Sequence, residues 1–447
     1  MLLTRATPEI ALAPTEKASS LRLPPELSAG SFASRLCWLG AKCFVAASGS
    51  ETYALQVSSK LQGVSQVADR DYEAFSESAQ RTEVVLLPNR QTSAVWSVLA
   101  QPRFRTEAQC LASSLVDGDL DGDRQCLVAC VDSLGALAVS RLHLTECSSG
   151  TQIQNRSSFT GATVEHPRVH PGPSCCALAR PGRSKSVRSP YIAVAGYLGC
   201  TVSVYEGELL VRHMRTLEHP SSLTFGSGSG AFGAQFHSTP CEHEELLYFT
   251  EGPAISLCDL RAPGMSFRRK IIGGHASMSS GATVSWYSCD LVGYEMALVG
   301  PQRCVLVVDV RRWGVLGRWW SCLKYDATTV MWASATSPSL DRRRTQGMLL
   351  YVSGRDNEMA CGTLSATAPE TQPQQATHEQ GRRPNALSSS REPVSAPCGW
   401  QQKGERLFGF RAENGWIGAA RYGECGWAGL TERGILYTLR TWSGKEL

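Results

Sequence analysis

The acidic run from Asp117 to Asp123 holds the residues of this sequence that could most directly do chemistry. Carboxylates occupy alternate positions, and Gly122 stands at the sixth position of the run. A Ca²⁺ ion takes about six to eight oxygen ligands, which such a run could supply by wrapping around the ion. An EF-hand is excluded, because its twelfth position holds Val128 where a bidentate glutamate is required. The first interpretation is therefore a solvated turn between strands, and a calcium-binding loop is the alternative.

The other signatures of catalysis or cofactor binding are missing or misplaced. Residues 228–233 match the glycine pattern of dinucleotide-binding loops, but residues 234–237 alternate like a strand where that motif needs a helix. No nucleophile elbow, no phosphate-binding loop and no zinc-protease motif occurs in the sequence. We therefore expect no catalytic residue, no cofactor and no enzymatic activity.

The 17 cysteines do not have the spacing of a metal site. There is no Cys-x-x-Cys pair, and Cys126 and Cys130 would lie about 13 Å apart on one strand face, too far to share a zinc ion. Their number is odd and the chain is long, so free thiols in a reducing compartment are expected rather than a disulfide framework. No signal peptide is evident, and the apolar runs are shorter than the roughly 20 residues of a membrane-spanning helix. We expect a cytoplasmic or nuclear protein that does not enter a membrane.

Basic residues gather in short clusters, at residues 268–270, 311–312 and 342–344, and Arg318 is followed by two tryptophans. Such clusters, with aromatic side chains beside them, are compatible with nucleic-acid binding. The chain as a whole carries 44 Lys and Arg against 40 Asp and Glu, a net charge of +4. This near balance favours solvated loops, so nucleic acid is the weaker alternative and other proteins are the expected partners.

Short β-branched and aromatic runs dominate the rest of the sequence, and only residues 60–80 could hold a helix. The runs recur in groups of three at 174–205, 232–259, 282–309 and 329–363, and less regularly at 35–57, 93–142 and 406–442, which makes seven groups. Equivalent points lie roughly 45 to 60 residues apart, slightly more than one blade of a β-propeller occupies. The pattern predicts an all-β fold: a single β-propeller of seven blades, each a four-stranded antiparallel sheet.

The domain boundaries follow from the same pattern. Residues 1–32 are expected to form a flexible tail, part of which could close the ring by pairing with the last blade. Residues 33–364 are assigned to blades one to six and residues 400–447 to the last blade. Residues 365–399, which are poor in apolar side chains, are predicted to be a disordered insertion between two blades.

Two strand endings resemble the Trp-Asp-x-Arg termination of WD repeats, with cysteine or valine in place of the tryptophan. They are Cys258-Asp259-Leu260-Arg261 and Val308-Asp309-Val310-Arg311, and Gly274-His275 precedes the second at the spacing of that family. The resemblance implies that such Asp and His residues belong to buried hydrogen-bond networks within a blade, a structural role. In WD-repeat substrate receptors of cullin-type ubiquitin ligases, arginines at this position face the adaptor protein. We therefore expect Asp259, Arg261, Asp309 and Arg311 to be candidates for partner binding.

The resulting hypothesis is a non-catalytic WD-repeat-like scaffold, acting as a subunit or adaptor of an intracellular complex. A substrate receptor of a cullin-type ligase is the sharper alternative. The run at Asp117–Asp123 is also similar to the calcium loops of FG-GAP propellers, a mostly extracellular family. That similarity leaves a calcium-binding or hydrolytic propeller as the alternative from another class.

Overall fold

The protein, seen in a computed structural model, is built from strands, and the all-β prediction is confirmed. The structure describes residues 4–11, 35–40, 43–58, 93–99, 104–116, 124–147, 150–154, 172–179, 190–207, 209–226, 245–262, 267–272, 285–334, 348–366, 402–412, 414–423, 426–432, 434 and 436–443. Within these residues there are 28 strands and no helix.

Sixteen of the strands form the first four sheets, each a four-stranded antiparallel meander in chain order. The first sheet is β2 (Leu36–Gly40), β3 (Cys43–Ser48), β4 (Glu51–Ser58) and β5 (Ser93–Val98), and the second is β6 (Ala108–Val116), β7 (Arg124–Asp132), β8 (Leu137–Cys147) and β9 (Gly150–Gln154). The third is β10 (Pro173–Leu178), β11 (Tyr191–Gly196), β12 (Thr201–Glu206) and β13 (Leu209–Arg215), and the fourth is β14 (Pro220–Phe225), β15 (Leu246–Glu251), β16 (Ala254–Asp259) and β17 (Phe267–Ile271).

Two further meanders are joined into one eight-stranded sheet. They are β18 (Ser288–Val292), β19 (Glu295–Val299), β20 (Val305–Asp309) and β21 (Gly314–Trp319), followed by β22 (Ala327–Ser334), β23 (Met348–Gly354), β24 (Glu358–Ala366) and β25 (Gln402–Arg411). The join is a short parallel pairing of β21 with β25, at Gly317↔Gln402 and Arg318↔Lys403. Trp319 is buried there against Gly404, where an added Cβ would lie 2.0 Å from the tryptophan Cβ, so the position has no room for a side chain.

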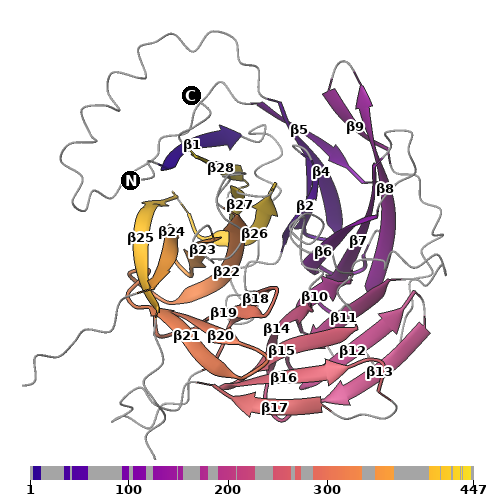
Figure 1. The fold of residues 1–447 in the computed structure, drawn as a ribbon. Coiled ribbons are helices and arrows are strands. Elements are labelled where there is room, and N and C mark those ends of the chain that lie inside the picture. Colours follow the sequence, from indigo (N-terminus) through magenta and orange to yellow (C-terminus); the bar gives the residue numbers. More distant parts are fainter. Residues whose placement is uncertain are drawn as a thin grey trace, which may run out of the picture.

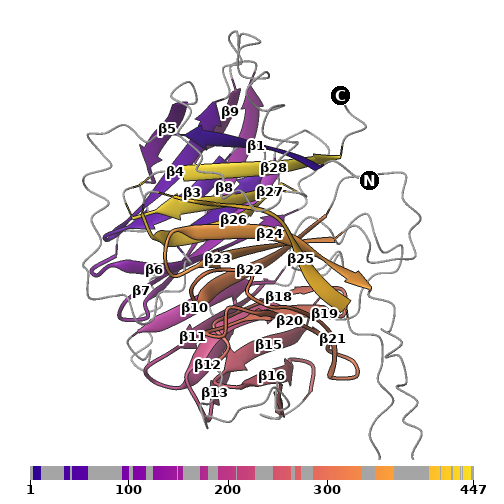
Figure 2. The same ribbon diagram turned by 90° about the vertical axis from the view of Figure 1, so that its left-hand side faces the viewer.

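The last sheet combines the two ends of the described chain. Strands β26 (Trp416–Tyr422), β27 (Gly426–Thr431) and β28 (Leu436–Ser443) pair in order, and β1 (Thr4–Ala11) adds to the outer side of β28. The β1–β28 register runs from Thr4↔Ser443 to Ala11↔Leu436. Figure 2 shows these two strands lying side by side.

The sheets follow one another around an axis, with their first strands innermost (Figure 1). The first strands contact each other in the order β2, β6, β10, β14, β18, β22 and β26, and β26 contacts β2 again. Each hydrophobic cluster lies between two neighbouring meanders, and the cluster that contains Leu36, Phe44 and Leu430 joins the last sheet to the first. Apolar side chains on both faces of a strand are therefore buried, as in Val305–Val308. This arrangement is consistent with a β-propeller.

Three predicted boundaries differ from the structure. The fourth and fifth meanders begin at β14 and β18 rather than at residues 232 and 282. Strand β14 has the sequence PSSLTF, whose serine and threonine content hid it from a search for apolar runs. Strand β25 pairs with β24, so residues 402–411 belong to the sheet of β22–β24 rather than to the last sheet. The segment that separates β24 from β25 thus connects neighbouring strands of one sheet.

Several predicted features lie outside the described residues. They are the helix at 60–80, the acidic run 117–123, the glycine motif 228–233, His275, the basic cluster 342–344 and all of the insertion 365–399 except residues 365 and 366, which end β24.

Candidate interaction surfaces

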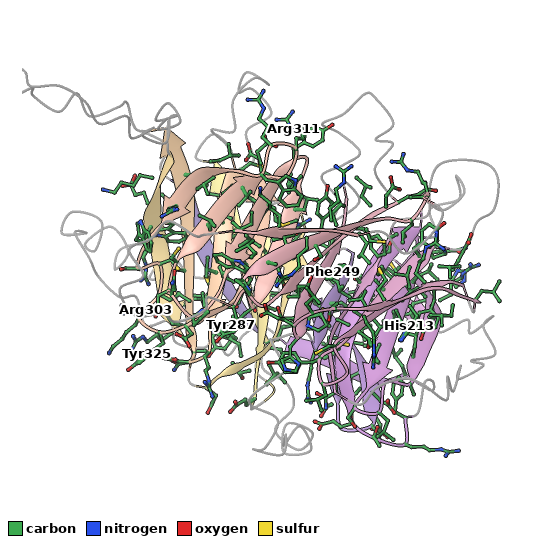
Figure 3. The ribbon with its side chains drawn as sticks, turned by 90° about the horizontal axis from the view of Figure 1, so that it is seen from below. His213, Phe249, Tyr287, Arg303, Arg311 and Tyr325 are labelled. Atoms are coloured by element: carbon green, nitrogen blue, oxygen red, sulfur yellow. The ribbon has the colours of Figure 1, made fainter. Side chains whose placement is uncertain are left out.

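The antiparallel meanders divide the turns between two rims of the molecule. The first and third strands of each meander end at one rim, which we call the box rim because it carries Asp259–Arg261 and Asp309–Arg311. The second and fourth strands end at the other, the linker rim, which carries Leu217, Arg303 and Tyr325. Figure 3 shows Arg311 at one end of the strands and Arg303 and Tyr325 at the opposite end.

The first Asp-x-Arg sequence forms a side-chain clasp at the end of β16. Asp259 Oδ1 accepts hydrogen bonds from the backbone N–H and from Nε of Arg261, both at 3.0 Å, and Oδ2 accepts one from Nη2 at 3.0 Å. The Arg261 side chain is 46% exposed. Arg212 of the preceding sheet donates from Nη2 to the carbonyl oxygen of Ala262 at 2.8 Å, which fixes the turn that carries the clasp.

The second sequence repeats this geometry one sheet further on, at the end of β20. Asp309 Oδ1 accepts hydrogen bonds from the Arg311 backbone N–H at 2.9 Å and from Nε at 3.1 Å, and Oδ2 accepts one from Nη2 at 2.7 Å. Asp309 is nearly buried, whereas the Arg311 side chain is 56% exposed. The guanidinium also lies over the ring of Tyr294, 4.3 Å from its centroid. One edge of each arginine is thus held by its aspartate, and much of the side chain faces solvent.

The second clasp also changes the acidity of the carboxyl groups around it. The hydrogen bonds from Arg311 lower the pKa of Asp309, because they favour the charged carboxylate. Burial, reinforced by the Asp309 charge, raises the pKa of Glu295. The two effects have opposite signs. Asp309 contributes stability above its unfolded pKa, and this contribution is lost as the pH falls through its lower pKa in the folded protein. The contribution of Glu295 is present at low pH and is lost as the pH rises through its raised pKa.

Replacing Arg311 by alanine is expected to raise the pKa of Asp309 toward its ordinary value, since the largest cause of the shift is removed. The measurement is an NMR titration of the aspartate side-chain carboxyl groups. Arg312→Ala is the matched control, because only the backbone of Arg312 contacts the carboxylate and should keep the low value. An unchanged Asp309 titration in Arg311→Ala would show that the clasp does not form in solution.

The WD-repeat resemblance also led us to expect Asp259 and Asp309 in buried networks with a histidine. In the described residues both carboxylates hold the arginine two positions on. Because His275 lies outside these residues, its network with Asp309 stays a prediction. His219, which precedes the first Asp-x-Arg ending in the sequence, lies on the linker rim, where its Nδ1 contacts the Tyr197 carbonyl oxygen at 2.7 Å and its ring stacks on Tyr197.

Buried carboxylates at other positions tie the sheets together, and the sequence analysis missed them. Glu251, which is fully buried, accepts hydrogen bonds from the Leu217 backbone N–H at 2.8 Å and from Ser256, and lies 3.4 Å from Arg269 Nε. Glu358 accepts from the Lys324 backbone N–H at 2.7 Å and from Arg406 Nη1 at 3.2 Å. Each of these two glutamates pairs with an arginine in the fourth strand of its own meander. Each also accepts a hydrogen bond from the connection that leads into the first strand of that meander. No local motif marks such residues, because their partners are distant in sequence.

A further ion pair lies among the innermost strands. Asp290 of β18 accepts hydrogen bonds through Oδ2 from the Trp332 backbone N–H of β22 at 2.8 Å and from Arg421 Nη2 of β26 at 2.5 Å. Three first strands are thus joined by one carboxylate, and the two opposite charges compensate each other. We interpret this pair as a structural contact at the centre of the molecule.

The described residues contain no group of His, Cys, Asp or Glu arranged to hold a metal ion. The described cysteines are free thiols and most of them are buried. Burial raises the pKa of Cys37 and Cys289 to about 12, so both thiols are protonated at neutral pH and poor nucleophiles. No helix long and apolar enough to cross a membrane occurs in the part of the chain that the structure describes.

Comparisons with known proteins leave the family unassigned. No family model matches the sequence, and no curated protein matches it. Among solved structures, the chain is similar to one titled "Crystal Structure of Mitotic Checkpoint Complex", with a TM-score of 0.48 and 9% sequence identity, over 92% of this chain and 88% of the other. The fold described above therefore rests on the strand pairing and packing of this chain itself.

Proposed function

We propose that the chain is a non-catalytic, WD-repeat-like scaffold: a single β-propeller of seven blades that binds other proteins as a subunit or adaptor of a complex. The 28 described strands group into meanders of four, and their first strands contact one another in a closed cycle, which supports this count. The pairing of β1 with β28 supports closure of the ring by the N-terminal segment. We place the protein in the cytoplasm or nucleus, where its thiols stay reduced.

The partner-binding residues that we propose are Asp259, Arg261, Asp309 and Arg311. The observation that carries this proposal is the repetition of the same clasp at equivalent positions of neighbouring sheets. Holding a long arginine side chain in one orientation lowers the entropy lost when a partner binds it. Arginine is also among the residues that most often dominate binding energy at protein interfaces. Exposed ion pairs contribute only about 0 to 1 kcal/mol to stability, so folding alone gives little reason for the repetition.

A narrower version of this function is substrate recognition for a cullin-type ubiquitin ligase. The position of Arg261 and Arg311 after the third strand matches the Asp-x-Arg position to which the sequence resemblance points. In this version the adaptor protein of the ligase would contact both arginines, and a substrate would bind elsewhere on the molecule.

The test is quantitative affinity purification from cells of the tagged full chain and of its Arg261→Ala, Arg311→Ala double variant. Arg312→Ala serves as the matched control, because this arginine neighbours the second clasp and is exposed. We expect a set of co-purifying proteins to be lost only from the double variant, whose melting temperature stays close to that of the parent. Loss of a cullin-ligase adaptor would favour the narrower version. If the double variant retained the same set of co-purifying proteins, the assignment of partner binding to the box rim would be overturned.

A further inference from the structure

A second surface with distinct chemistry lies on the linker rim, where the two meanders of the eight-stranded sheet meet. We call it the Tyr325 surface and define it by Arg303, Trp320, Lys324, Tyr325 and Arg355. Arg303 comes from the turn between β19 and β20, the next three from the connection between β21 and β22, and Arg355 from the turn between β23 and β24. Trp320 and Tyr325 are 51% and 50% exposed, although they are among the side chains with most to gain from burial.

The backbone beneath this surface is held by hydrogen bonds from both meanders. The Lys324 N–H donates to buried Glu358 at 2.7 Å, and the Cys322 N–H donates to the Arg303 carbonyl oxygen at 3.1 Å. Arg303 Nη1 donates in turn to the Lys324 carbonyl oxygen at 3.1 Å. The exposed rings therefore stand on a preorganised segment, which reduces the ordering entropy that a partner must overcome.

The charge of the surface is positive. Arg303, Lys324 and Arg355 are all exposed, and the neighbouring Asp326 is half-buried. The Arg355 N–H donates to the Asp326 carbonyl oxygen at 3.0 Å, which places the third cation beside the same segment. Cations also approach the rings: Arg318 Cζ lies 5.7 Å from the Trp320 ring centroid, and Lys324 Nζ lies 5.5 Å from that of Tyr325.

We propose that the Tyr325 surface binds an acidic segment of a partner protein that carries an aromatic or large apolar side chain. Carboxylates of the segment pair with the three cations, while its apolar side chain packs against Tyr325 and Trp320. This occupant is favoured over single-stranded nucleic acid, because bases bind by stacking on ring faces and here each ring already has a cation near its face. The inference goes beyond the proposed function, since it concerns the rim opposite the two clasps.

The test uses the full chain and a fluorescent random copolymer of glutamate and tyrosine, with binding followed by anisotropy. We expect saturable binding that is weakened at least about tenfold by Tyr325→Ala and by the charge reversal Arg303→Glu, Lys324→Glu. The matched control is Arg268→Glu, Lys270→Glu, at two exposed residues of β17 that belong to neither the clasps nor the Tyr325 surface. It makes the same change of net charge and is expected to leave binding within about twofold, as exposed changes outside an interface do.

Three results would overturn the proposal. Equal loss in the two charge-reversed variants would mean that the copolymer responds only to net charge. Unchanged binding in Tyr325→Ala would show that the copolymer does not contact the Tyr325 ring. Tighter binding of oligothymidylate than of the copolymer, lost in the same linker-rim variants, would identify a nucleic-acid surface instead. None of these results depends on the clasps, so failure here is distinguishable from failure of the proposed function.

Discussion

Replacing Trp427 by alanine is expected to lower the free energy of unfolding by about 4 kcal/mol, the usual cost of deleting a large buried aromatic side chain. Trp427 is 1% exposed and lies between strands of the last sheet and its neighbour. Its ring packs edge-on against Trp416, with centroids 5.0 Å apart, and against Phe410 at 6.1 Å. The loss therefore leaves a cavity lined by rigid rings that cannot collapse to fill it. Chemical denaturation followed by tryptophan fluorescence and circular dichroism measures the change.

Trp320→Ala is the matched control, because this tryptophan is half exposed and its loss should cost less than about 1 kcal/mol. Since Trp427→Ala could prevent folding altogether, Trp427→Phe provides an intermediate variant that keeps an aromatic ring. Equal effects of the two alanine variants would contradict the packing of the last sheet described above.

The second large effect is expected from Glu251→Ala, which should destabilise the protein by about 3 to 5 kcal/mol. Glu251 is fully buried, so its removal leaves the buried groups that it binds without this acceptor. Here the backbone N–H of Leu217 and the hydroxyl of Ser256 would also lose their acceptor, and Arg269 would lose a carboxylate 3.4 Å away. Thermal unfolding of the variant and the parent, compared at the same pH, measures the effect.

Glu218→Ala provides a closely matched control for the same arginine. Glu218 Oε1 lies 2.9 Å from Arg269 Nη2, but its side chain is 43% exposed, so water can replace the interaction. We expect a loss of less than about 1 kcal/mol. An equal loss of stability in Glu218→Ala and Glu251→Ala would show that the effect of Glu251 does not come from its burial beneath the β13–β14 connection.

How far the sequence predicts this fold depends on the kind of signal each element carries. Strands such as Val305–Asp309 and Leu246–Glu251 are apolar on both faces and stand out as short β-branched or aromatic runs. Their recurrence predicts antiparallel meanders without any relative for comparison. Strand β14 was missed because its buried serines bind other strands: Ser221 donates to the Trp286 carbonyl oxygen, and Ser222 Oγ accepts from the Cys289 N–H. A polar side chain that forms its hydrogen bonds with a neighbouring strand leaves no pattern in the local sequence from which its own strand could be predicted.

Contacts of the candidate-site residues can be predicted from the sequence only where the partners are close in the chain. Asp259 and Arg261, like Asp309 and Arg311, contact each other two positions apart, so their clasp is encoded locally. Glu251 and Glu358 act on partners from other strands and connections, which spacing does not reveal. The Tyr325 surface combines turns of two meanders with the connection between them, and the sequence showed only that Arg318 precedes two tryptophans. In the structure these two tryptophans differ, because Trp319 is buried whereas Trp320 is exposed on the Tyr325 surface.

Hydrogen exchange on the complex with a co-purified partner tests the central claim most directly, namely that the paired clasps of the box rim contact that partner. Exchange is compared, peptide by peptide, between the free full chain and the complex. We predict slower exchange at residues 259–262 and 309–313 on binding, and no such slowing in the Arg261→Ala, Arg311→Ala variant at the same partner concentration. Slowing confined to other parts of the chain, with both of these turns unchanged, would contradict the account.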